Sequence, residues 1–172
     1  MKKIISLILA LVMVMSLAVT AFADNEGEGG ATPPATGSIT IKPPADVDAD
    51  ATITYKIYKV FDAAGNGTNI SYKLVSGKTT APAGFSVDTA GNVTYAGTGT
   101  ELTEADIAAI AGYVTDSDLV DTATSTGTAN AVASGLPNGY YYITTTTGSV
   151  VTIDSTNPNA TVDDKNSVPI LT

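Results

Sequence analysis

The chain lacks cysteine, histidine and arginine altogether, and each absence excludes a class of chemistry. Without cysteine there is no disulfide, no thiolate ligand for zinc and no thiol nucleophile. Without histidine the commonest general base is missing, and with it every mechanism in which histidine activates a serine or a cysteine. Without arginine, no guanidinium group is available to bind a carboxylate or phosphate through two parallel hydrogen bonds. The composition predicts that the protein is not an enzyme, although glycosidase chemistry with two carboxylates stays formally open.

Positive charge is also scarce, and this bears on partners and metals. The chain has 17 acidic residues against 8 lysines, which gives a net charge of −9 and argues against a nucleic-acid partner. Asp46, Asp48 and Asp50 have the spacing of a calcium-binding loop. Ala51 and Ile57 stand where that loop requires glycine and glutamate. We therefore expect an acidic surface loop, with no metal and no cofactor.

The one long apolar run lies at the N-terminus. Two lysines precede the uncharged run 4–19, and Ala21-Phe22-Ala23 follows it. This is the pattern of a secretory signal peptide, and the run is short for a membrane-spanning helix of about 20 residues. We expect a signal peptide over residues 1–23, export of a mature chain that begins at Asp24, and no membrane segment after cleavage.

The mature chain begins with a polar segment and continues as β-structure. Residues 24–36 are acidic and then rich in glycine and proline, which predicts a flexible leader. From Gly37 onward β-branched residues dominate and turn signals recur at short intervals, so we expect an all-β sandwich or barrel. The best strand is 52–61, where apolar and polar residues alternate. Residues 85–88 and 92–95 flank a turn at 89–91 and predict a hairpin.

One segment breaks the β-pattern and predicts a single helix over residues 104–115. Thr103 and Asp106 have the spacing of a capping box, in which the two residues satisfy each other's free backbone N–H groups. Apolar residues then fall on one helical face. They are Ile107, Ile110, Ala111 and Val114.

The last third of the chain predicts strands on both sides of a turn. Leu136-Pro137-Asn138-Gly139 is the turn, residues 140–147 are the first strand and 149–154 its hairpin partner. Tyr140, Tyr141 and Tyr142 alternate between the two faces of that strand. Packing in the core and across strands is the favoured interpretation of these tyrosines, and a sugar-stacking platform is the alternative.

Three segments together resemble a known family. They are GSITI…TITYKIYKVF at 37–61, LPNGYYYI at 136–143 and VDDKNSVP at 162–169. In this order, behind a signal peptide, they resemble the N-terminal domain of Gram-positive, sortase-assembled pilins. The resemblance implies an Ig-like β-sandwich over 37–168, with 169–172 starting a linker or a further domain. It implies a structural subunit of a cell-surface pilus, whose partners are other pilin subunits and a pilus-specific sortase.

The resemblance also assigns a lysine. In the family the linking lysine lies in a Tyr-Pro-Lys-Asn type of motif, and the matching residue here is Lys165, followed by Asn166. Asp163 and Asp164 depart from that pattern. Their carboxylates favour the charged ammonium, whereas a lysine nucleophile attacks in its neutral form. We therefore expect the sortase to supply the desolvation that Lys165 needs. Lys78 lies in a Gly-Lys-Thr-Thr turn and is the accessible competitor of Lys165.

Related domains also form an internal bond between a lysine and an asparagine. By strand parity Lys59 faces the same side as Tyr55 and Ile57, so it is the candidate lysine for such a bond, and Asn138, Asn159 and Asn166 are the late asparagines. The alternative is that the Lys59 stem reaches outward to solvent.

Taken together, the sequence predicts an exported protein at the cell surface or cell wall of a Gram-positive bacterium. The chain contains no LPxTG-like sorting signal, so we expect it to be the leader and first domain of a longer pilin. The alternative function is a secreted or wall-attached adhesin or tip-pilin module that binds host protein or glycan.

Overall fold

The computed structural model describes residues 36–66, 69–97, 99 and 101–165. The signal peptide expected at 1–23, nearly all of the leader, and the segment 166–172 lie outside these residues, so the corresponding predictions stay predictions.

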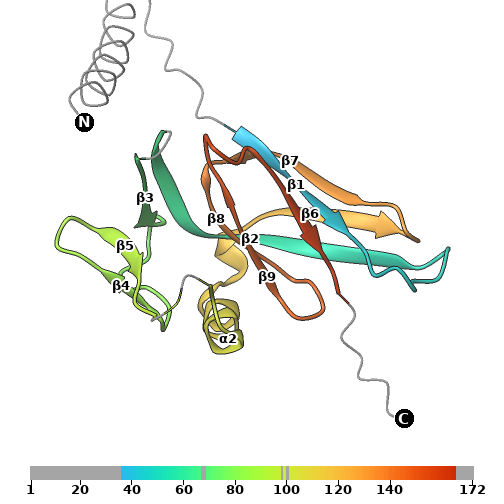
Figure 1. Ribbon diagram of the computed structural model, residues 1–172, viewed down its shortest axis with the longest axis horizontal. Helices are drawn as coiled ribbons and strands as arrows, with labels where there is room; N and C mark the ends of the chain where they lie inside the picture. Colours follow the sequence, from blue (N-terminus) through green and yellow to red (C-terminus); the bar gives the residue numbers. More distant parts are fainter. Residues whose placement is uncertain (1–35, 67–68, 98, 100, 166–172) are drawn as a thin grey trace, which may run out of the picture. The chain divides into compact units, whose positions relative to one another are not determined.

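The described part of the chain is mostly β-sheet and contains one α-helix (Figure 1), which confirms the predicted all-β class. Strands β10, β1 and β7 form one sheet in that order. The second sheet has the order β4-β5-β3-β2-β8-β9, and β6 also pairs with β2. The strands are β1 Thr36–Lys42, β2 Thr52–Asn66, β3 Asn69–Leu74, β4 Phe85–Val87, β5 Asn92–Tyr95, β6 Leu119–Thr126, β7 Ala131–Pro137, β8 Gly139–Ile143, β9 Ser149–Ile153 and β10 Asn159–Asp163.

Strand β2 is longer than predicted and organises the second sheet. It pairs in turn with β6, β8 and β3, and its register shifts next to Ile57 and again between Lys59 and Phe61. Such shifts re-aim side chains, because an extra residue on one strand breaks the alternation of faces. Val60 and Phe61 are therefore both buried. The simple parity that placed Lys59 with Tyr55 does not hold through this part of the strand.

Two apolar clusters form the core. The first contains β1, β2 and β8 side chains that are fully buried, among them Ile39, Ile57 and Ile143. The second is built around Phe61 and includes Ile110 of the helix. Burial of a large aliphatic side chain contributes about 1.5–3 kcal/mol, so these clusters supply most of the driving force for folding.

Helix α2 spans Glu104–Tyr113 and has the predicted capping box between Thr103 and Asp106. It ends two residues earlier than predicted, because Val114 is extended with φ −74° and ψ 146°. The predicted apolar face is correct at Ile110, which is fully buried, and wrong at Ala111, which is exposed. A single turn of 3₁₀-helix, Asp116–Asp118, follows.

Strand β6 was not predicted from the sequence. Its inward-facing positions include Ala123 and Ser125, which are buried but small or polar. The strand therefore lacks the alternation of large apolar and polar residues by which strands are found.

Strands β1 and β10 run parallel, with Ile39 opposite Ala160 and Lys42 opposite Asp163. Parallel neighbours end at the same edge of a sheet. The ends of the two strands therefore bring Lys42, Asp163, Asp164 and Lys165 together, and we call this place the β1/β10 end.

Candidate functional site at the β1/β10 end

Lys165 lies two residues beyond the last residue of β10 and its side chain is exposed. The residue before it is still paired with the sheet, because the backbone N–H of Asp164 donates to the carbonyl oxygen of Lys42 at 2.8 Å. Lys165 is therefore the first residue after the sheet ends, next to a segment that the sheet holds in place.

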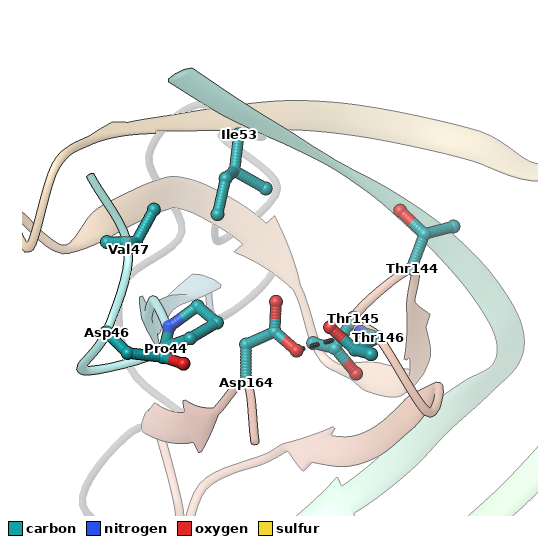
Figure 2. A pocket seen from close by; sticks show the side chains of 8 residues that line it. All are labelled: Pro44, Asp46, Val47, Ile53, Thr144, Thr145, Thr146 and Asp164. Atoms are coloured by element: carbon teal, nitrogen blue, oxygen red, sulfur yellow. Dashed lines mark hydrogen bonds between the residues drawn. The ribbon is translucent and has the colours of Figure 1, made fainter. Parts of the chain in front are cut away.

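Two adjoining hollows open at the β1/β10 end, and Lys165 lines one of them. This hollow has a volume of about 470 Å³ and lies between residues 43–46 and residues 163–165. The other, of about 370 Å³, extends toward the β8–β9 loop (Figure 2) and includes Val47, Ile53 and Thr144–Thr146. Both are lined by Pro44, Asp46 and Asp164.

Asp164 lines both hollows and is only 5% exposed. Its Oδ2 accepts a hydrogen bond from the Tyr55 hydroxyl at 3.0 Å, and its Oδ1 accepts one from the backbone N–H of Thr146 at 2.8 Å. Tyr55 is fully buried. Burial, and then the hydrogen bond to the Asp164 carboxylate and its charge, raise the pKa of Tyr55 to about 12, so its hydroxyl stays a donor at neutral pH.

Asp163 pairs with Lys42 and not with Lys165. One of its carboxylate oxygens lies 3.6 Å from the Lys42 amine, and both side chains are more than half exposed. Among the described residues neither aspartate forms an ion pair with Lys165: the Asp164 carboxylate turns inward to Tyr55, and that of Asp163 turns sideways to Lys42. The expectation that the two carboxylates favour the charged form of Lys165 stays a prediction.

The Lys59 side chain, the candidate for an internal bond, is 16% exposed, and its amine forms an ion pair with Asp62 on the same strand. A Cβ added to Gly139 would come within 2.8 Å of the Lys59 Cε, so the lysine stem crosses the backbone next to Asn138. No contact between this amine and a candidate asparagine is present among the described residues. The internal bond remains a prediction.

Lys78 differs from the sequence-based expectation that it is an accessible turn lysine. Its amine lies 2.8 Å from Asp118, donates to the carbonyl oxygen of Tyr113 at 3.1 Å and sits 4.3 Å from the centre of the Tyr113 ring. The Lys78 side chain is only 18% exposed. Because its amine contacts a carboxylate, a carbonyl oxygen and an aromatic ring, Lys78 is not the accessible competitor of Lys165 that its turn position predicts.

The tyrosines of β8 pack as the favoured interpretation predicts. Tyr141 is fully buried in the first cluster, whereas Tyr140 and Tyr142 pack against the second. The Tyr140 ring lies 5.5 Å from Phe61 and 5.7 Å from Tyr72, measured between centroids. Tyr140 therefore packs against neighbouring aromatic side chains of the second cluster.

In the part of the chain that the structure describes, no three His, Cys, Asp or Glu residues gather closely enough to hold a metal ion. The loop carboxylates of Asp46, Asp48 and Asp50 are exposed. The same described residues contain no helix long and apolar enough to cross a membrane.

Comparison with family models, curated proteins and solved structures gives no match to this chain.

Proposed function

We propose that this chain is a structural subunit of a covalently linked pilus on a Gram-positive cell surface, and that Lys165 is the amine through which a pilus-specific sortase joins it to the next subunit. The observation that carries the proposal is the placement of Lys165. It is exposed, it lies two residues beyond the end of the last strand, and it borders an open hollow of about 470 Å³.

Comparison with the other lysines of the described domain supports this choice. Three of them form ion pairs: Lys42 with Asp163, Lys59 with Asp62 and Lys78 with Asp118. Lys56 and Lys73 are exposed but lie within β2 and β3, where backbone pairing on neighbouring strands surrounds them. Lys165 is exposed, lies beyond the end of a strand and forms no ion pair with any described residue.

In this reaction the domain supplies only the attacking amine. The neutral Lys165 amine attacks an acyl carbon that the sortase presents from another subunit; the new C–N bond forms, the bond to the enzyme breaks and the amine loses a proton. Because the enzyme supplies the activated acyl group, the domain needs only an accessible amine and room for the incoming chain. The absence of histidine and cysteine from the sequence is compatible with this passive role.

The Ig-like form of the sandwich belongs to the same proposal. The hydroxyl of the buried Tyr141 donates to the carbonyl oxygen of Pro137, four residues earlier at the end of β7. A tyrosine that bonds back to the backbone a few residues upstream is typical of Ig-like sandwiches, where it fixes a corner between strands.

The test is substitution of single lysines in the protein expressed from its own gene, in cells that carry its sortase. Lys165→Arg keeps the positive charge but removes the primary amine. Lys42→Arg, at the same end of the sheet, is the matched control. We expect the high-mass ladder on denaturing gels to disappear only with Lys165→Arg. An intact ladder in that variant refutes the proposal, and export of unlinked subunits by the wild type favours the adhesin alternative.

A further inference from the structure

Asp164, the residue before Lys165, lies just beyond the end of β10 but still forms three hydrogen bonds with other parts of the domain. Asp164 is bound at three points: its N–H to the Lys42 carbonyl, its Oδ2 to the Tyr55 hydroxyl and its Oδ1 to the Thr146 N–H. These partners belong to the end of β1, to the first part of β2 and to the β8–β9 loop. Figure 2 shows the Asp164 side chain between the 44–47 segment and Thr144–Thr146.

We infer that Asp164 is a positioning residue, which, through its hydrogen bond with the buried Tyr55 hydroxyl, fixes the chain immediately before Lys165 and so holds the lysine at the rim of the hollow. The inference rests on the proposed function of Lys165, and it names the groups that prepare this lysine for joining.

The burial of the two partners explains why this contact is firm. Tyr55 is fully buried and Asp164 is 5% exposed, so water does not compete well for either group. Hydrogen bonds to a charged group are stronger than those between neutral groups, and they are stronger still away from water. Tyr55 lies in the first core cluster, among side chains that cannot shift without opening a cavity. The anchor of Asp164 is therefore as rigid as the core.

Asp163, the residue before Asp164, differs from it in its contacts. Its carboxylate pairs with the Lys42 amine, and both side chains are more than half exposed. An exposed pair of this kind contributes little, so it does not fix the backbone before Lys165. Positioning of Lys165 is thus assigned to Asp164, and Asp163 provides a control position of the same charge and size.

Loss of positioning lowers the rate of a reaction between two groups, because the productive geometry is reached less often. A displacement of about 1 Å can cost up to about a hundredfold in rate. For a lysine that retains its sheet contact through the Asp164 backbone, we expect a decrease of about tenfold.

The experiment compares Tyr55→Phe with Tyr141→Phe in the complete protein. Both substitutions remove one hydroxyl from a fully buried tyrosine, but the Tyr141 hydroxyl bonds Pro137 and not the β1/β10 end. Asp164→Asn and Asp163→Asn form a second matched pair. Two quantities are measured well below the melting temperature of every variant: the rate of sortase-dependent joining at Lys165, and the heteronuclear NOE of the Lys165 backbone amide.

We expect Tyr55→Phe and Asp164→Asn to slow joining about tenfold and to lower the amide NOE, whereas both controls stay within about twofold of wild type. If the two residues act through one contact, the double variant joins no more slowly than the slower single variant. A purely stabilising role would leave the NOE and the joining rate of the folded variants unchanged, and that result overturns the inference. A failure of the proposed function is distinguished from a failure of this inference by the wild-type protein. If the proposed function is wrong, the linkage in the wild type maps to a residue other than Lys165.

Discussion

Replacement of Lys78 by methionine tests whether this lysine is a structural element of the domain. Methionine keeps most of the apolar stem but removes the charge. The Lys78 amine lies 2.8 Å from Asp118, and the two side chains are 18% and 6% exposed. We therefore expect a substantial loss of stability, because the substitution leaves the Asp118 carboxylate buried without its cation.

The magnitude follows from this degree of burial. Breaking a fully buried ion pair costs about 3–5 kcal/mol, and an exposed pair contributes about 0–1 kcal/mol. The carboxylate here is buried and the lysine slightly exposed, and the lysine also contacts the Tyr113 ring and carbonyl. We expect Lys78→Met to lower the free energy of unfolding by about 2–3 kcal/mol.

The assay is urea denaturation at pH 7, followed by far-UV circular dichroism. The midpoint should fall while the slope stays unchanged. Lys73→Met is the matched control, because Lys73 is exposed on β3 and makes no ion pair with a described residue. We expect the control to stay within about 0.5 kcal/mol of wild type. Asp118→Asn combined with Lys78→Met should recover part of the loss. If Lys78→Met and Lys73→Met are equally stable, our account of the pair is refuted.

Three further predictions concern the rest of the domain. Thr103→Ala removes the N-cap of α2, so we expect the free energy of unfolding to fall by about 1 kcal/mol in urea titrations, and no change would contradict the capping role. In the same assay Gly37→Ala should destabilise the domain by about 1–3 kcal/mol, because a Cβ at this position would lie 2.0 Å from the Pro158 carbonyl oxygen. Gly112→Ala lies in open space on the helix and should stabilise the domain by up to about 1 kcal/mol. Effects of equal sign would refute this reasoning. The pKa of Tyr55 is raised to about 12, so its contribution to stability is complete below pH 10 and is lost as the pH rises from 10 through 12. Unfolding measured across that range should show a smaller loss of stability in Tyr55→Phe than in wild type, and parallel curves would contradict the assignment.

Local patterns in the sequence were sufficient for much of the fold. The capping box of α2 and the hairpin of β4 with β5 depend on residues within a few positions of one another, and both are present. Strand β6 was missed because Ala123 and Ser125 fill its inward positions without large apolar side chains. Small or polar residues at buried positions do not produce the apolar alternation from which a strand is predicted, so the sequence of β6 alone does not reveal it.

The candidate site was predicted only in part, because its contacts join distant parts of the chain. Lys165 was named by resemblance and is exposed as expected for an accessible amine. The roles of its neighbours were not predicted: Tyr55 and Asp164 are 109 residues apart, and the parallel pairing of β1 with β10 sets their meeting point. Lys78 was misjudged for the same reason, since its partner Asp118 lies on a separate segment.

The central claim is that Lys165 joins one subunit to the next, and it is tested most directly by mapping the linkage itself. Polymers released from the cell wall are digested with protease, and branched peptides are sequenced by tandem mass spectrometry. The account predicts a branched peptide in which the side-chain nitrogen of Lys165 carries the C-terminal residue of another subunit. Unmodified Lys165 throughout the polymer, with the branch at Lys42, Lys73 or any other residue, would contradict it.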